Sequence, residues 1–310
     1  MNHGWIAGIL LLAQQSEMPD QLTIDRDGQY IAKANREQFS IDFLDIPIVD
    51  NTELERFMDK VAKKVYRKPQ NATIHDSGRI IREVAGAKLD RRAFEAQFYG
   101  YFYSQGPLKA EVPQLAIYPN VDSELLANIR VNPIGYYVTY FNSNNKNRYH
   151  NISLAAKAIN NYVVHPGDTF SFNRVVGVRT PAKGYKQAKV IVRGEYSEGI
   201  GGGICQISST LFNAVDRAGL QIVERYSHSR SVPYVPPGRD ATVNWGGPDF
   251  SFTNNYNQPI LIRAQALPGR VYISLSSSDV INHKPRHVPS ASETLPEEIH
   301  AGTDAEIPVP

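Results

Sequence analysis

The segment Gly199-Ile200-Gly201-Gly202-Gly203-Ile204-Cys205-Gln206 decides how the second half of the chain is organised. Three consecutive glycines interrupt any regular element, and the residues from Gln206 to Ala218 then carry apolar side chains at helical spacing. Gly219 is a suitable helix stop. The pattern predicts a helix that begins close to Cys205, preceded by a tight glycine-rich turn.

Cys205 is the one cysteine of the 310-residue chain, so neither an intramolecular disulfide nor a cysteine-based zinc cage can form. At a helix N-terminus, unpaired amides and the helix dipole lower the pKa of a thiol and favour the thiolate. Gly202 and Gly203 would let a substrate backbone approach and would expose N–H groups to a developing oxyanion. The simpler interpretation is that Cys205 is a small buried hydrophobic residue.

A nucleophilic cysteine needs a base, and His228 is the best candidate because it lies among polar residues shortly after the predicted helix. Ser229, Asp240 or Asp249 could hold the second ring nitrogen, and the sequence leaves that choice open. The planar fork of Arg225 could bind a carboxylate, but a buried salt bridge or a surface charge fits this residue equally well.

Other chemistries are disfavoured by composition and motif. Eight histidines include no His-x-x-x-His or His-x-x-Glu-His pattern, so we expect no metal. The glycines are not followed by Gly-Lys-Ser/Thr, and no dinucleotide-binding pattern opens a helix, so we expect no cofactor. A net charge of +2 gives no broad field for nucleic acid.

The remaining sequence predicts an α+β fold in two domains. Residues 20–125 read as a small α+β domain, with short strands before Ile48, a helix from Asn51, a hairpin around Asp76-Ser77-Gly78, and a helix from Leu89 with an Asp cap.

Residues 131–280 read as a sheet-rich domain. Its predicted elements are a crossing strand from Arg130 to Tyr140, a polar loop over Ser143–Asn147, a helix from Ile152 to Tyr162, and strands over 169–173, 188–193, 249–253, 259–266 and 271–275.

The two ends differ in composition from these domains. Residues 1–19 contain an apolar stretch from Trp5 to Ala13 that suits a signal-peptide core or an anchor remnant, although no Lys or Arg precedes it. Membrane association through this end is therefore an expectation. Residues 284–310 are rich in Pro, Ser and Glu, and we predict a disordered tail there.

Several separated segments, taken in order, resemble the VanW family. They are Arg148–Ile152, Pro166–Asn173, Gly201–Ser209, Glu224–Ser229, Tyr234–Val243 and Asp249–Asn254. The resemblance covers about half of the chain. Upstream, Asn71 to Phe98 resembles, more diffusely, the peptidoglycan-binding-like domain that often precedes VanW domains.

The resemblance implies an exported or membrane-anchored protein of the Gram-positive cell envelope, at the membrane surface or in the wall. Some VanW domains are implicated as L,D-transpeptidases, which use a cysteine to form 3-3 cross-links between peptidoglycan stem peptides. On that basis Cys205 corresponds to the nucleophile. Asn173, Arg179 and Tyr185 could line the groove, but we favour strand-end hydrogen bonding, a surface charge and core packing for them.

Three functions remain open from the sequence. The first is a cysteine acyltransferase with Cys205 as nucleophile and His228 as general acid and base. The second is a non-enzymatic module that binds cell-wall peptide, glycan or glycopeptide, with Cys205 structural. The third, weaker alternative is a cysteine peptidase or amidase that transfers its acyl group to water. Reactivity of the Cys205 thiol separates the enzymes from the binding module.

Overall fold

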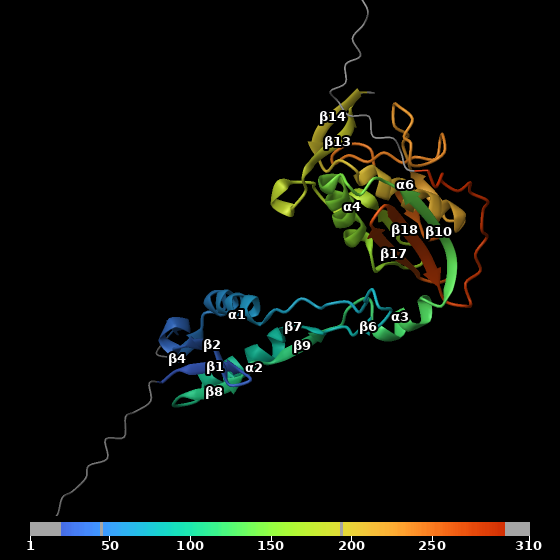
Figure 1. Cartoon of the computed structure of the whole chain (residues 1–310). Coiled ribbons are helices and arrows are strands. Elements are labelled where there is room, and N and C mark those ends of the chain that lie inside the picture. Colours follow the sequence, from blue (N-terminus) through green and yellow to red (C-terminus); the bar gives the residue numbers. More distant parts are fainter. Residues whose placement is uncertain (1–19, 44–45, 193–194, 295–310) are drawn as a thin grey trace, which may run out of the picture. The chain divides into compact units, whose positions relative to one another are not determined.

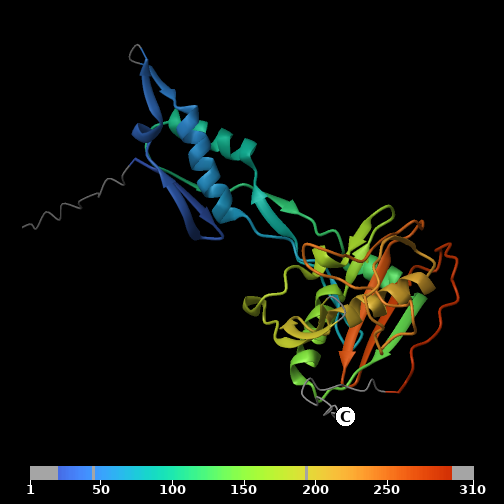
Figure 2. The ribbon, with the colours of Figure 1, turned by 90° about the horizontal axis from the view of Figure 1, so that it is seen from above.

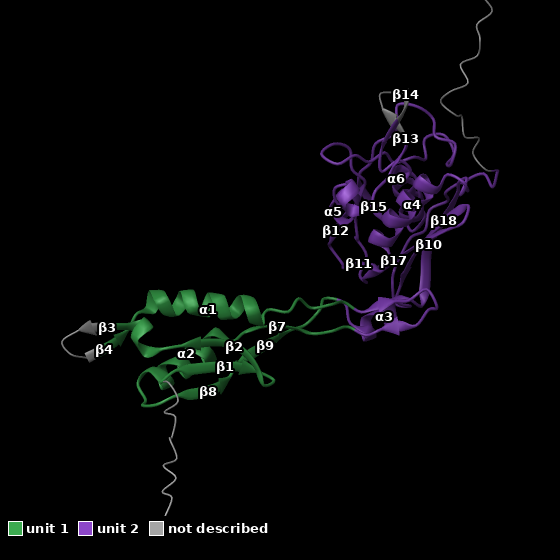
Figure 3. Ribbon diagram, turned by 60° about the vertical axis from the view of Figure 1, so that its left-hand side comes forward, with its two compact units in different colours: residues 1–71, 83–120 green, residues 72–82, 121–310 purple. Residues whose placement is uncertain are grey.

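The computed structural model describes residues 20–43, 46–192 and 195–294. The chain divides into two compact units, which Figure 3 distinguishes by colour. Unit 1 comprises residues 1–71 and 83–120, and unit 2 comprises residues 72–82 and 121–310. Both units combine helices with small, mostly antiparallel sheets (Figure 1), so the predicted α+β class is confirmed.

Unit 1 is built on a three-stranded sheet of order β2-β1-β8, in which β1 pairs antiparallel with β2 and parallel with β8. Two further strand pairs, β3-β4 and β7-β9, are antiparallel. The strands are β1 (Leu22–Arg26), β2 (Gln29–Ala34), β3 (Ser40–Phe43), β4 (Ile46–Val49), β7 (Gly86–Leu89), β8 (Leu108–Glu111) and β9 (Gln114–Ile117). The helices are η1 (Arg36–Phe39), α1 (Asn51–Val65) and α2 (Arg91–Phe102).

Capping side chains fix where the helices of unit 1 begin. Asp50 accepts hydrogen bonds from the amides of Thr52 and Glu53, and Asp90 accepts one from the amide of Ala93. The predicted Asp cap of α2 is thus confirmed. The apolar faces of both helices pack in a core that belongs to unit 1 alone, to which α2 contributes aromatic side chains such as Phe94 and Phe98.

Unit 2 is built on an antiparallel sheet of order β10-β18-β17-β11, with a smaller sheet of order β12-β16-β15 beside it. The strands are β5 (Thr73–Ile74), β6 (Ile80–Ile81), β10 (Asn132–Tyr140), β11 (Tyr162–Val164), β12 (Thr169–Ser171), β13 (Gln187–Val192), β14 (Glu195–Ile200), β15 (Gln221–Glu224), β16 (Ser251–Thr253), β17 (Ile260–Leu267) and β18 (Arg270–Ser277). The helices are α3 (Ser123–Ile129), α4 (Lys146–Ile159), α5 (Phe172–Val176), η2 (Pro181–Lys183) and α6 (Ile204–Arg217).

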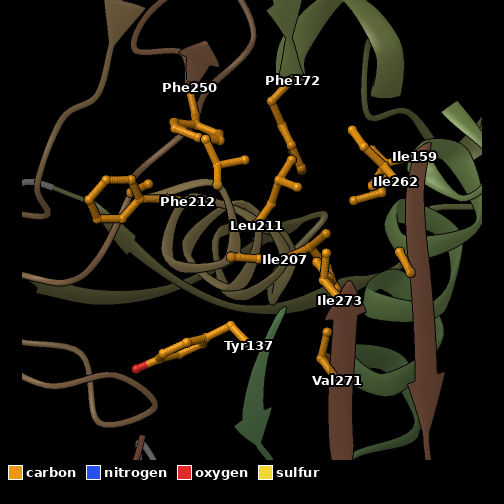
Figure 4. Packing of buried hydrophobic residues seen from close by; sticks show 14 of the residues in the cluster. Tyr137, Ile159, Phe172, Ile207, Leu211, Phe212, Phe250, Ile262, Val271 and Ile273 are labelled. Carbon is orange, nitrogen blue, oxygen red and sulfur yellow. The ribbon is translucent and has the colours of Figure 1, made fainter. Parts of the chain in front are cut away.

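Helix α6 lies with α4 against one face of the four-stranded sheet (Figure 2). Ile207 and Leu211 of α6 and Ile273 of β18 belong to one buried cluster (Figure 4), and all three side chains are fully buried. Gly135 of β10 permits this close approach, because a Cβ atom there would lie 2.5 Å from the carbonyl oxygen of Ala214. The helix that begins beside Cys205 is therefore a central element of the core.

The opposite face of the sheet is covered in part by the hairpin β5-β6 and helix α3. Alternation along β11 and β17 turns Val163 and Leu261 to this side, where they pack with Ile74 and Leu126. From the sequence, this hairpin was predicted to belong to the domain of residues 20–125. In the structure it belongs to unit 2, because it packs on Val163 and Leu261 of the sheet.

Helix α4 starts earlier than the sequence predicted. Residues 146–151 are helical although Ser143–Asn147 was predicted to be a polar loop, and α4 ends at Ile159 instead of Tyr162. The side chain of Asn145 accepts a hydrogen bond from the amide of Arg148 and caps the helix. The polar residues therefore form the exposed first turn of a longer helix.

The segment after His283 contains neither helix nor strand up to residue 294, yet its first part is held against unit 2. Arg217 donates to the carbonyl oxygen of Val288 at 2.7 Å, and Tyr137 donates to that of Pro289 at 2.8 Å. Val288 is 3% exposed. These bonds oppose the predicted disorder from residue 284, whereas residues 295–310 lie outside the described part.

The apolar stretch from Trp5 to Ala13 also lies outside the described residues. Within the described residues, none of the helices is both long and apolar enough to cross a bilayer.

We expect Gly219, just after α6, to permit the close contact with the backbone of the segment around Lys284. Its φ is +78°, and a Cβ atom there would lie 1.9 Å from the backbone oxygen of Lys284. We expect Gly219→Ala to lower the free energy of unfolding by more than the roughly 1–2 kcal/mol of a left-handed alanine. Urea unfolding measures this.

Gly167→Ala is the matched control, because Gly167 has a φ of +82° with no atom within 4 Å of the added Cβ. Equal losses in the two variants would show that residues near Lys284 do not pack on α6.

Candidate active site

Cys205 occupies the first turn of α6, as the sequence predicted. The chain enters the helix through left-handed glycines, with φ of +88° at Gly201 and +105° at the N-cap Gly203. The N-cap has no side chain, so the amides of the first turn receive no side-chain cap. Cys205 is half-buried at this end of the helix.

Gly202 has a different role from the one expected. It is buried, and a Cβ atom there would lie 2.5 Å from the carbonyl oxygens of both Ala188 and Lys189. Its own carbonyl oxygen accepts a hydrogen bond from Asn151. Gly203 lies equally close to Arg148 and Ile152, at 3.0 Å from a Cβ position. The glycines let α6 pack against its neighbours, and nothing here assigns them to substrate.

The polar side of α6 binds the segment Arg239–Val243. Ser208 donates to the carbonyl oxygen of Ala241 at 2.6 Å, and Ser209 accepts from the amide of Ala241 at 2.9 Å. One turn further, Asn213 and Arg239 exchange two hydrogen bonds, of 2.8 and 2.7 Å. Because these groups are buried, each bond left unpaired would cost about 1–3 kcal/mol. The segment is therefore fixed to the helix that carries Cys205.

His228 is held in turn by this segment. Tyr226 and Thr242 form an isolated antiparallel bridge, which aligns the two loops. Asp240 then accepts two hydrogen bonds through one carboxylate oxygen, from the backbone amide of His228 and from its ring Nδ1, both at 2.6 Å. The ring is thereby oriented, and His228 acts electrostatically on Cys205: the pKa of the thiol is lowered and that of the imidazole is raised.

The thiol of Cys205 has three polar neighbours. His228 is one; the others are the carbonyl oxygen of Val243 at 3.6 Å and the hydroxyl of Thr242 at 3.9 Å from Sγ. Burial alone would raise the pKa of the thiol. The hydrogen bonds with His228 and Thr242, and the positive charge of the imidazolium, outweigh burial and lower the pKa of Cys205 below its ordinary value.

His228 changes in the complementary direction. Burial opposes the charged ring, but the hydrogen bonds with Asp240 and Cys205 raise the pKa of His228 to about 9. Burial likewise opposes the carboxylate of Asp240, and the hydrogen bond from His228 keeps the pKa of Asp240 below its ordinary value. These shifts favour a thiolate at Cys205 beside an imidazolium at His228 that is hydrogen-bonded to the Asp240 carboxylate.

The structure separates the three candidates for orienting His228. Asp240 performs this role, whereas Ser229 is exposed and Asp249 is bonded elsewhere, to Ser171 and to the amide of Asn173. Among the described contacts none joins Ser229 or Asp249 to the ring of His228.

Arg225 is placed beside the site and not in it. It donates to the backbone oxygens of Asp240 and Gly238 at 2.6 Å and reaches the Asp240 carboxylate at 3.4 Å. Of the three alternatives left open by the sequence, the salt bridge describes this residue. Arg225 positions Asp240, and its guanidinium is already hydrogen-bonded within the protein.

Asn173 and Tyr185, which could have lined a groove, have the structural roles that we favoured for them. Asn173 donates to the backbone oxygens of Asn244 and Pro248, and Tyr185 is buried in the core. Arg179 does not: it is half-buried and its terminal nitrogens are shielded from solvent, so the expected surface charge is wrong.

The polar stripe of α6 and the position of Tyr234 were not predicted from the sequence. Gln206 is fully buried and joins Arg148 to Thr139 through its amide. Tyr234 is buried beside Cys205, and burial followed by the negative charge of that residue raises the pKa of its hydroxyl. Polar residues at positions 206, 209, 210 and 213 share one helical face, and this spacing was a usable signal.

Within the described part of the chain, no group of His, Cys, Asp and Glu is arranged to hold a metal ion. The chemistry available to the described residues is that of the thiolate, the imidazolium and the amides at the start of α6.

The chain is similar to known proteins across nearly its whole length. A family profile described as "VanW like protein" matches residues 147–276, which include Cys205, His228 and Asp240. The uncharacterized protein YoaR of Bacillus subtilis (strain 168) is 60% identical over 296 residues, 96% of this chain and 98% of its own length. The vancomycin B-type resistance protein VanW of Enterococcus faecalis (strain ATCC 700802 / V583) is 33% identical over 115 residues, 36% of this chain and 42% of its own. No solved structure matches significantly.

Asp240→Asn should move the reactivity of Cys205 to higher pH. Loss of the carboxylate removes a group that raises the pKa of His228, so the imidazolium is lost at lower pH and no longer stabilises the thiolate. The measurement is the rate of Cys205 alkylation by iodoacetamide as a function of pH. Since there is one cysteine, the rate reports this thiol alone.

Asp168→Asn is the control for this experiment, because it removes an exposed carboxylate of unit 2. An Asp240→Asn profile that coincides with those of the unchanged protein and the control would contradict the assigned role of Asp240.

Proposed function

Because this chain belongs to the VanW-like family, we propose that it acts on peptidoglycan in the cell envelope, as a cysteine-dependent acyltransferase of the L,D-transpeptidase type. Its substrates would be peptidoglycan stem peptides, and its product a 3-3 cross-link. The protein would work outside the cytoplasm, at the membrane surface or in the wall.

The observation that carries the proposal is the chain of contacts from Cys205 to His228 to Asp240. A nucleophile in hydrogen-bond reach of a base, with the base oriented by a third group, is the arrangement that covalent catalysis requires. The lowered pKa of Cys205 favours the nucleophilic thiolate, and the pKa of about 9 at His228 favours the imidazolium that can act as an acid. A cysteine that only packs needs neither change.

Acylation follows from these protonation states. The Cys205 thiolate attacks the carbonyl carbon of the peptide bond before the terminal D-residue, and a carbon–sulfur bond forms as the oxygen becomes negative. In the uncapped first turn of α6 the amides of Ile204 and Gln206 donate to Gly201 and Gly203, so the amide of Cys205 is the one suited to that oxygen. When the carbon–nitrogen bond breaks, the His228 imidazolium gives its proton to the departing amine.

The thioester is then transferred to an amine of a second stem peptide. Neutral His228 takes the proton from this amine as it attacks the thioester carbonyl, and the carbon–sulfur bond breaks to restore the thiolate and imidazolium. Asp240 holds the ring in place through both steps. If water attacked in place of the amine, the same residues would make a peptidase, so the acceptor decides the reaction.

The substrate class comes from the family and not from the geometry of the site. The relative from Enterococcus faecalis is named for vancomycin resistance, and this directs the proposal to the cell envelope. The residues of the site support the type of reaction, and membership of the family supports a substrate in the cell envelope.

Cys205→Ala should abolish both the acyl-enzyme and the cross-linked dimer, because no other residue of the chain carries a thiol. His228→Gln should slow the reaction by roughly 10²–10⁴-fold, the usual contribution of general acid–base catalysis. The intact protein is incubated with disaccharide-tetrapeptide, and mass spectrometry follows both products.

His165→Gln is the matched control, since His165 is half-buried in a turn of the same unit. If the unchanged protein binds the muropeptide but never forms an acyl-enzyme, where a known transpeptidase does, a binding module replaces the enzyme. Formation of tripeptide without dimer would indicate hydrolysis instead of transfer.

A further inference from the structure

Arg179 occupies an unusual position next to the glycine turn that leads into α6. Its aliphatic part lies against Gly201, where an added Cβ atom would be 3.3 Å from Cβ of Arg179. Its guanidinium is placed over the ring of Phe172, with 5.9 Å to the centroid. The side chain thus passes along the turn that presents Cys205, and its head group rests on the core.

The two terminal nitrogens of Arg179 have no hydrogen-bond acceptor. Nη1 and Nη2 are both buried, and neither has a partner among the described residues. Two other arginines of unit 2 are different: Arg225 donates to Gly238 and Asp240, and Arg239 donates to Asn213 and Asp216.

Asp249 is the nearby carboxylate that could have paired with Arg179, since its charge acts on the guanidinium. Its oxygens are already used. They accept from the hydroxyl of Ser171 at 2.6 Å and from the amides of Asn173 and Phe250 at 2.8 Å. Neutral donors therefore satisfy the hydrogen bonding of this aspartate, and its carboxylate does not pair with Arg179.

An unpaired cation in the interior is costly, and such groups call for a functional explanation. Burial lowers the pKa of Arg179, and the charges of Tyr185, Cys205 and Asp249 offset this only in part. The missing partner of a guanidinium is an oxyanion, and its planar fork matches a carboxylate best. Cys205 is near enough for the two charges to interact, so an anion on Arg179 would be beside the thiolate.

We propose that Arg179 binds the free carboxylate of the residue that leaves during acylation, and so restricts the site to the last peptide bond of its substrate. This inference rests on the proposed function for the identity of the substrate. One residue spans at most about 3.3–3.6 Å, so the terminal carboxylate lies about that far from the carbonyl that the thiolate attacks. Arg179 turns toward this carboxylate when the substrate enters.

The direct test needs no peptide, because two alkylating reagents differ only in charge. Iodoacetate carries a carboxylate next to its reactive carbon, and iodoacetamide carries a neutral amide there. In both cases the Cys205 sulfur forms a bond to carbon and iodide leaves. The ratio of the two rates cancels the thiolate fraction and reports how well the site receives a carboxylate.

Arg179→Gln should reduce the iodoacetate-to-iodoacetamide ratio by about tenfold, the usual worth of a charge-assisted hydrogen bond. Arg174→Gln is the matched control: it removes one positive charge from the same region, but Arg174 is exposed and donates to the backbone oxygen of Thr169. An unchanged ratio in Arg179→Gln, or an equal fall in both variants, would overturn the proposal.

Thermal unfolding distinguishes this role from a structural one. Because Arg179 is unpaired, Arg179→Met should leave the unfolding temperature of the ligand-free protein unchanged or raise it. A clear loss of stability would show that the guanidinium holds the fold together and would contradict the proposal.

A peptide experiment then separates the carboxylate site from the reaction. The unchanged protein should prefer a stem tetrapeptide with a free carboxylate over its carboxamide, and Arg179→Gln should lose that preference mainly through KM. If the alkylation ratio falls as expected while no peptide is acylated, the carboxylate site stands and the transpeptidase proposal fails. If peptides are acylated without preference for the acid, the carboxylate site is wrong and the enzyme stands.

Discussion

The hydrogen bonds between the polar face of α6 and the segment Arg239–Val243 are the constraint on which the site depends. The apolar face of α6 is fixed against the sheet, so its direction is set by the core. Ser208, Ser209 and Asn213 then hold the segment that contains Asp240 and Thr242 at a fixed register along the helix. One helix therefore positions the nucleophile and, through a second segment, the residue that orients the base. A side chain lost from this face would disturb the geometry without touching Cys205.

The electrostatics of the site follow from this arrangement. A thiol at the end of a buried helix would ordinarily be driven toward its neutral form, because burial opposes charge. Here burial acts on Cys205, His228 and Asp240 alike, and the two hydrogen bonds that join them outweigh it in each case. The charged forms of Cys205, His228 and Asp240 therefore depend on one another. Arg179 adds a positive charge to the same surroundings without being paired, which makes the site ready for an anion.

Local signals allowed much of this to be predicted from the sequence. Glycines, apolar spacing and capping residues gave the helix that begins beside Cys205 and the Asp cap of α2, because these depend on neighbouring residues. The orienting residue could not be chosen, since the pairing of Tyr226 with Thr242 joins loops that are separated along the chain. Arg179 was misjudged as a surface charge for the same reason: its burial depends on packing against Gly201 and Phe172. The start of α4 was missed because polar residues, capped by Asn145, form its first turn.

The central claim is that Cys205 and His228 form an ion pair supported by Asp240 in the resting protein. The most direct measurement is a pH titration of the imidazole nitrogen chemical shifts of His228, recorded together with the ultraviolet absorbance of the thiolate. The account predicts a doubly protonated ring and a thiolate at neutral pH, with the ring losing its proton near pH 9. A neutral ring beside a protonated thiol at neutral pH, with the histidine titrating close to its ordinary value of 6.5, would contradict it.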